Sequence, residues 1–313
     1  MIKNIDIHGS QLQLDSLTSY KTLEAKDISF VGSEKEHKIV YMNSGPRALS
    51  TVFLRMMESR GDFIVYNEPT IPVYDRVHYR ELTKEWFRED SYVTFDDVKK
   101  TIYDSAKKSH VFIKDMSFSS HDYILEDFSF MSDPRIHFIF LVRNPHHTSI
   151  SFYRKNGGIV PKTSDLIGLQ KLYEEYETIR KINSNGVKII FSEQVYEEPK
   201  RTMYAYCDYL KIPFTEKTFK WRKHNEHFNG HNQWNEQKIG THIHHWHGRA
   251  IESEKIGKPS IYEVDEVGNP TFMEISDDDH RSVMKEAYEE NLIYYNKFIQ
   301  VKEDHLLPLN EEK

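Results

Sequence analysis

A loop of small and polar residues follows the first apolar run of the chain. The run over 39–42 predicts a buried strand, and a helical pattern begins at Thr51. The loop between them reads Asn43-Ser44-Gly45-Pro46-Arg47-Ala48-Leu49-Ser50. Backbone N–H groups at a helix start favour phosphate, the Arg47 guanidinium adds a full charge, and Ser50 and Thr51 add hydroxyl groups that can also cap the helix. We therefore predict a phosphate-binding loop; an ordinary capped strand-to-helix turn is the alternative, and the Walker triplet Gly-Lys-Ser/Thr is absent.

A second strand end carries groups that bind anions. The apolar run over 138–142 ends at Arg143, and Asn144 and Pro145 suit the cap and the first turn of a following helix. Ser151 lies seven residues after Asn144 and therefore on the same helical face. Ligands of open α/β sheets bind at the carboxyl ends of the strands, so we predict that Arg143 and Ser151 bind a phosphate beside the first loop. The alternative is a strand-end arginine and a solvated serine that share no function.

The remaining pattern predicts an α/β fold with a central, mostly parallel sheet flanked by helices. Three more apolar runs lie at 63–66, 111–113 and 187–191. Their continuous rather than alternating apolarity is typical of strands that are covered on both faces. Helical patterns are clearest in three stretches, over 165–184, 199–210 and 277–302. We predict an N-terminal extension over 1–36 and a single domain over 37–313, in which 220–275 forms an acceptor pocket or a lid.

Composition restricts the class of ligand. The 313 residues carry a formal net charge of -7, which argues against nucleic acid, because duplex-binding proteins usually carry a basic excess. The single cysteine, Cys207, excludes an intramolecular disulfide and gives no sign of an oxidising compartment. No apolar run approaches the roughly 18 residues of a membrane span, and the first residues lack the apolar core of a signal peptide. We expect a cytoplasmic protein without a membrane partner, whose oligomeric state the sequence does not indicate.

Three segments resemble the sulfotransferases that use 3′-phosphoadenosine 5′-phosphosulfate. The segment over 46–51 resembles the family's 5′-phosphosulfate loop, and the segment over 141–151, with Arg143 and Ser151 at the family's spacing, is similar to its 3′-phosphate segment. A third likeness covers 191–214. The resemblance implies a P-loop-like fold, the same nucleotide cofactor, and transfer of a sulfuryl group to a hydroxyl or amine of a small metabolite. The family loop usually has glycine where this chain has Leu49, which suggests the subgroup with Ser-Gly-Pro-Arg-x-x-Ser-Thr.

The resemblance also implies catalytic groups. Arg47 holds the position of the family's loop lysine or arginine, and Lys114 resembles the lysine that reaches the sulfuryl group. In the steroid and phenol enzymes a histidine base lies two residues after that lysine, and here the position is Met116. Three other side chains are candidates for the base, namely His121, Asp115 and Glu68. His121 ranks first because imidazole titrates near neutral pH, although an amine that attacks as the free base would need a dedicated base less.

A histidine-rich segment precedes the last predicted helix. Histidines between 224 and 247 admit a zinc site, but cysteine ligands are missing, and we predict no bound metal. We expect these histidines, with Trp234 and Trp246, to line the acceptor pocket or its lid. The adjoining basic stretch loosely resembles a late loop of the family that also holds the 3′-phosphate, which implies Arg249 and Ser253 as further ligands.

Three other functions remain open from the sequence. A nucleotide-dependent kinase or NTPase would need a Walker lysine and an acidic Mg²⁺ ligand, and the lysine is absent. A non-catalytic nucleotide-binding module is compatible with Met116 at the base position. A histidine-metal enzyme would place its metal in the segment over 224–247.

Overall fold

The computed structural model describes residues 37–79, 92–221, 247–250, 252–257, 264–266 and 270–309. The predicted extension over 1–36 lies outside the described residues. The same holds for the histidine-rich segment up to residue 246, with Trp234 and Trp246, and for other parts of the expected lid over 220–275.

Five strands in the described ranges form one parallel sheet. They are β1 (Ile39–Ser44), β2 (Phe63–Asn67), β3 (His110–Met116), β4 (Ile136–Val142) and β5 (Val187–Phe191). The strand order is β2-β3-β1-β4-β5, and every pairing is parallel. The predicted α/β class with a parallel sheet flanked by helices is therefore confirmed. Because Ser44 aligns with Met116 on one side and with Leu141 on the other, the carboxyl ends of the three central strands lie at one edge.

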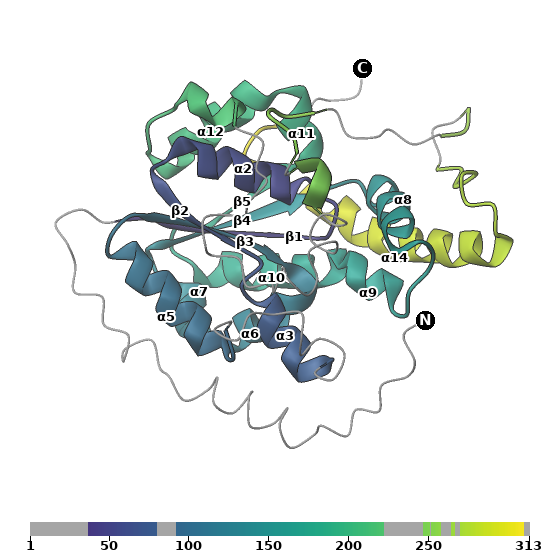
Figure 1. Ribbon diagram of the computed structural model, residues 1–313, viewed down its shortest axis with the longest axis horizontal. Coiled ribbons are helices and arrows are strands. Elements are labelled where there is room, and N and C mark those ends of the chain that lie inside the picture. Colours follow the sequence, from purple (N-terminus) through teal and green to yellow (C-terminus); the bar gives the residue numbers. More distant parts are fainter. Residues whose placement is uncertain are drawn as a thin grey trace.

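Helices cover both faces of the sheet (Figure 1). One face packs against α2 (Ser50–Arg60), α11 (Ser192–Glu197) and α12 (Pro199–Leu210), and the other against α5 (Phe95–Ala106), α6 (Ser117–Glu126), α7 (Phe128–Ser132) and α10 (Leu169–Ile182). In β1, Val40 and Met42 face the first layer, whereas Ile39 and Tyr41 face the second, and all four are fully buried. Burial on both faces explains why the strands read as continuous apolar runs.

Further helices gather beyond the carboxyl ends of the strands. There α3 (Ile71–His78) follows β2, while α8 (Pro145–Asn156), α9 (Thr163–Ile167) and α14 (Asp278–Gln300) lie together at one end of the molecule in Figure 1. Short 3-10 helices are η2 (Glu216–Phe219) and η3 (Lys302–Asp304). As predicted, Asn144 caps α8 by accepting a hydrogen bond from the His146 N–H at 2.9 Å, with Pro145 in the first turn. None of the helices in the described ranges combines the length and the apolarity that crossing a bilayer requires.

The helix expected over 165–184 is interrupted, and that part of the sequence interpretation is wrong. Gly168 ends α9 with φ 75° and also stands before the first residue of α10. Left-handed backbone suits glycine, and a Cβ added at this position would stand 2.8 Å from the Ser117 Oγ. The apolar periodicity continues across the break, so the pattern alone favours a single helix.

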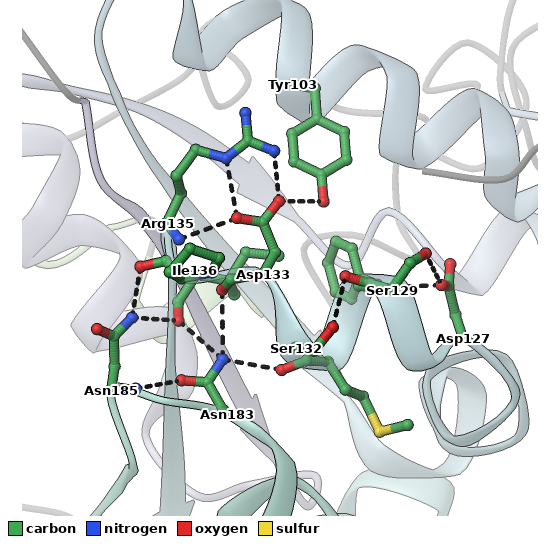
Figure 2. A network of polar contacts seen from close by, with 12 residues as sticks. Tyr103, Asp127, Ser129, Ser132, Asp133, Arg135, Ile136, Asn183 and Asn185 are labelled. Atoms are coloured by element: carbon green, nitrogen blue, oxygen red, sulfur yellow. Dashed lines mark hydrogen bonds and ion pairs between the residues drawn. The ribbon is translucent and has the colours of Figure 1, made fainter. Parts of the chain in front are cut away.

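A polar network fixes the amino-terminal edge of the sheet, opposite the strand ends discussed below (Figure 2). The Arg135 Nε donates to Asp133 at 2.8 Å, and the Tyr103 hydroxyl donates to the same carboxylate at 2.9 Å. The Asn183 side-chain amide donates to the Met131 carbonyl at 2.8 Å and to the Ile136 carbonyl at 3.3 Å, and so ties the end of α10 to α7 and to the start of β4. Such contacts satisfy backbone groups at chain reversals. Together they fix the positions of α5, β4 and α10 relative to one another.

Candidate active site

The loop between β1 and α2 has an unusual backbone. Arg47 and Leu49 are in the left-handed region, with φ 61° and 64°. Leu49, not Ser50 or Thr51, is the N-cap of α2, and its side chain makes no capping hydrogen bond. The expectation that Ser50 or Thr51 closes the helix as a cap is therefore wrong. Left-handed residues in a loop direct successive N–H groups toward one point, and an uncapped helix start leaves its own N–H groups available to an anion.

Two neighbouring strand ends hold the carbonyl groups of this loop. The Arg143 Nη1 donates to the Arg47 carbonyl, and the Ser192 hydroxyl donates to the Ala48 carbonyl, each at 2.6 Å. In a planar trans peptide the N–H of the following residue points the opposite way. Anchoring both carbonyls toward β4 and β5 therefore turns the N–H groups of Ala48 and Leu49 away from those strands. Gly45 fits here because a Cβ would stand 2.6 Å from the Ile167 carbonyl oxygen.

A basic cluster forms where the loop meets α8. The Arg47 Nε donates to the Ser151 Oγ at 3.1 Å, so the two anion sites predicted from separate segments are in direct contact. One turn after Ser151, burial and then the positive charges of Arg47 and Arg249 lower the pKa of Lys155. We call Arg47, Arg143, Ser151, Lys155 and Arg249 the basic cluster. The sequence interpretation missed Lys155, although its spacing of four residues from Ser151 places both on one face of a helix.

Ser253 lies in a different set of contacts. Its hydroxyl accepts a hydrogen bond from the Trp221 Nε1 at 3.2 Å and donates to the Ala250 carbonyl at 2.7 Å. Through these contacts Ser253 connects the short helical turn over 247–250 to Trp221, which follows η2. Its predicted role in binding a phosphate stays a prediction.

A buried ion pair lies beside the basic cluster. Lys114 at the end of β3 donates to Glu68, which follows β2, and both side chains are almost completely buried. Burial raises the pKa of Glu68, but the charges of Lys114, His247 and Arg47 outweigh it, so the pKa lies below its usual value. Burial lowers the pKa of Lys114. The negative charge of Glu68 offsets this effect only in part, so the pKa stays below its usual value. Glu68 itself has φ 53°, a strained backbone conformation of the kind that clusters at functional sites.

Asp115 follows Lys114 on β3 and interacts electrostatically with both members of this ion pair. The Tyr41 hydroxyl donates to one of its oxygens at 2.6 Å, and the Thr70 hydroxyl and the Met116 N–H donate to the other at 2.8 and 3.0 Å. Burial nevertheless raises the pKa of Asp115 to about 7. Met116, at the position where the resemblance to the steroid and phenol sulfotransferases implies a base, packs with Ile71 in a small apolar cluster. The Asp115 carboxyl group therefore joins β1, the segment before α3 and the end of β3 beside the ion pair.

The raised pKa of Asp115 predicts a pH-dependent effect of Asp115→Asn on stability. A group with a folded-state pKa of about 7 and a usual value of 3.8 contributes stability that is complete below pH 3.8 and is lost as the pH rises toward 7. Asparagine cannot ionise, so the stability of the variant relative to the native protein should rise by about 1.4 kcal/mol per pH unit across this window. Urea unfolding at several pH values between 4 and 8 measures the slope. A constant difference would show that Asp115 is already ionised at low pH.

The structure does not bring His121 into this group. Its Nδ1 lies 2.6 Å from Asp122, and its Nε2 lies 3.0 Å from Glu174 on the neighbouring helix α10. The two contacts orient the ring along the contact between α6 and α10. His121 as the base therefore has no support from its contacts.

Other buried polar groups were missed by the sequence interpretation. Glu175 is fully buried, where it accepts hydrogen bonds from Asn43 and, at 3.1 Å, from Ser120. Burial raises its pKa well above the usual value. A signal was present, because Glu175 lies three residues after Leu172 on the apolar face of a helix, where a carboxylate is out of place.

His247 connects the late segment of the chain to the site. Its Nδ1 lies 3.0 Å from the Thr51 Oγ1, and its Nε2 lies 3.8 Å from the Glu68 carboxylate. The sequence interpretation placed His247 in a pocket-lining segment without a defined role. Across the described residues, no three His, Cys, Asp or Glu side chains are placed to hold a metal ion.

Comparisons with known proteins give partial likenesses. No family model matches the chain. "Branched-chain-amino-acid aminotransferase-like protein 2" of Arabidopsis thaliana is 28% identical over 190 residues, and the like-named protein 1 is 26% identical over 193 residues. These matches cover 59% and 60% of this chain but 32% of each relative, so the chain spans about a third of the length of the curated relatives it matches.

Solved structures that are similar in part are sulfotransferase domains. The domain from the Synechococcus PCC 7002 olefin synthase is 14% identical, with a TM-score of 0.45 over 76% of this chain and 96% of that domain. The domain from the curacin biosynthetic pathway is 12% identical, with a TM-score of 0.46 over 83% of this chain and 98% of that domain.

Proposed function

We propose that this protein transfers a sulfuryl group from 3′-phosphoadenosine 5′-phosphosulfate to a small-molecule acceptor. The observation that carries the proposal is the position of Arg47. Its side chain donates to Ser151 in the basic cluster, and its charge also acts on Glu68 and Lys114. A nucleotide with phosphates at both ends of its ribose needs two anion sites side by side, and Arg47 belongs to both.

In this proposal each of the two sites binds one phosphorylated end of the nucleotide. The N–H groups of the loop over 45–51 and the start of α2 bind the 5′-phosphosulfate, with hydroxyl donors from Ser50 and Thr51. Arg143 and Ser151 bind the 3′-phosphate, and Lys155 and Arg249 add positive charge there. The uncapped helix start, the anchored loop carbonyls and the converging cations fit such a ligand.

The bound donor would supply an activated sulfuryl group, and the protein's own contribution is electrostatic. Negative charge builds on the oxygen that bridges sulfur and phosphorus as the bond from sulfur to that oxygen breaks. Arg47 in the loop is hydrogen-bonded to Ser151, and Lys114 near it is paired with Glu68, so both cations stabilise that charge without reorganising. Losing one such donor costs about 3 kcal/mol in the transition state. Because Glu68 holds Lys114 in place, the ammonium group is already oriented before the donor binds.

Thermal unfolding with three nucleotide or cofactor probes tests the proposal. A ligand at about 100 times its Kd stabilises a protein by roughly 2.7 kcal/mol. We expect adenosine 3′,5′-bisphosphate to raise the melting temperature, and ATP with Mg²⁺ and pyridoxal phosphate to leave it unchanged. A rise with ATP and Mg²⁺ alone would favour a kinase or NTPase. A rise with pyridoxal phosphate alone would favour the amino transfer that the names of the Arabidopsis relatives suggest.

A further inference from the structure

His247 occupies the position from which a base would serve sulfuryl transfer. It lies between Thr51, in the first turn of the predicted donor-binding helix, and Glu68, the partner of Lys114. Its side chain is only 10% exposed. Thr51 holds the Nδ1 edge of the ring, so the Nε2 edge is directed to the side of the buried ion pair. The start of α2 and the end of β2 therefore meet, at this one imidazole, a residue that comes 196 positions after Thr51 in the chain.

The chemistry of the neighbouring groups favours His247 over Glu68 as the proton acceptor. The charges around Glu68 hold its pKa below the usual value, and a carboxylate of low pKa is a weak base. Imidazole titrates near neutral pH and accepts protons more readily. The distance of 3.8 Å between Nε2 and Glu68 exceeds that of a hydrogen bond, so Glu68 acts on the ring through its charge. That negative charge stabilises the imidazolium that forms.

We infer that His247 is the general base of the reaction and that the acceptor is a hydroxyl compound. The inference rests on the proposed function. The acceptor oxygen forms a bond to sulfur, while the bond from sulfur to the phosphate oxygen breaks and leaves its electron pair on the phosphate. The proton of the hydroxyl passes to the Nε2 of His247 and from there to water. The products are a sulfate ester and adenosine 3′,5′-bisphosphate.

The presence of a base distinguishes the two acceptor classes. A neutral amine attacks through its own lone pair, and its proton leaves after the new bond has formed. A hydroxyl group is a poor nucleophile until its proton is being removed. A base held between the donor loop and the sulfuryl-binding lysine therefore fits an alcohol or a phenol.

Slow transfer of the sulfuryl group to water tests the role of His247, because water is a hydroxyl acceptor that needs no pocket. We expect the native protein to release adenosine 3′,5′-bisphosphate from the donor faster as the pH rises through the histidine range. His247→Gln should lower the plateau rate by about 10²-fold and abolish the pH-dependent limb. Its affinity for adenosine 3′,5′-bisphosphate, measured by calorimetry, should remain within about threefold of the native value, since the base contributes to proton transfer rather than to nucleotide binding.

A matched histidine control is His110→Gln, which lies at the amino end of β3, away from the strand ends that form the site. This variant should keep the native rate and pH profile. A native pH profile in His247→Gln would overturn the inference and leave the proposed function standing. A native protein that neither binds the bisphosphate nor cleaves the donor would overturn the proposed function itself.

Phenol and aniline, as probes of equal size, test the acceptor class. We expect phenol to be sulfated by the native protein and the rate to fall about 10²-fold in His247→Gln. Aniline is already a free base at neutral pH, so it would attack without first losing a proton to His247. Transfer to aniline and not to phenol would overturn the assignment of a hydroxyl acceptor.

Discussion

Lys114→Met is expected to lower the free energy of unfolding by roughly 3–5 kcal/mol near pH 7, because it leaves the Glu68 carboxylate buried without its partner. Without Lys114, only the charges of His247 and Arg47 would oppose the effect of burial, so the pKa of Glu68 should rise. The loss should shrink as the pH falls and the carboxyl group takes up a proton in the folded state. Urea unfolding at pH 7 and at pH 4 measures both effects. The same variant should lose sulfuryl transfer.

The double variant Lys114→Met with Glu68→Gln separates charge burial from loss of packing. Removing both charges should recover much of the stability, since replacing a buried ion pair by neutral groups is often close to neutral. If Lys114→Met cost less than about 1 kcal/mol, or if the double variant were no more stable than the single one, the pair would not be the buried ion pair described above.

Arg143→Ala is expected to reduce the affinity for adenosine 3′,5′-bisphosphate by roughly 10- to 100-fold, the equivalent of a charge-assisted hydrogen bond to phosphate. Affinity for adenosine 5′-monophosphate should fall much less, so the variant loses most of its discrimination between the two nucleotides. A smaller loss of both affinities follows from the second role of Arg143, which anchors the Arg47 carbonyl. Calorimetric titrations with the two nucleotides give the ratio directly.

Arg154→Ala is the matched control for this experiment. Arg154 lies on α8 near Ser151, but its side chain is 53% exposed and pairs with Glu274. Because an exposed pair of this kind contributes little, its removal should leave both affinities within about twofold of native. Unchanged discrimination in Arg143→Ala would mean that this arginine does not contact a 3′-phosphate, and the division of the nucleotide between the two sites would be wrong.

Local sequence signals are sufficient for the strands and for the residues at their ends. The run over 187–191 reads as a buried strand because both faces of that strand are covered, and β5 has those bounds. Since parallel strands end at one edge, the sequence alone is enough to expect Arg47, Lys114 and Arg143 near one another. The break at Gly168 is not predictable in the same way. Gly168 is in contact with Ser117 from another helix, and the local sequence does not show that contact.

Residues that reach the site through tertiary packing are not predictable from spacing. His247 lies 196 positions from Thr51 and contacts it only because the chain near residue 247 packs against the start of α2. Ser192 anchors the Ala48 carbonyl across 144 positions. His121 is favoured by its chemistry, whereas its place on α6 gives it Glu174 as a partner. The chemistry of a side chain is enough to rank candidates for the catalytic base, but its position in the fold determines whether it lies near the site.

A crystal structure of the protein with adenosine 3′,5′-bisphosphate tests the central claim most directly. The claim predicts the 5′-phosphate on the N–H groups of residues 47–51 and the 3′-phosphate within hydrogen-bonding distance of the Arg143 and Ser151 side chains. A nucleotide bound elsewhere, or one whose phosphates contact only a single one of these two sites, would contradict it.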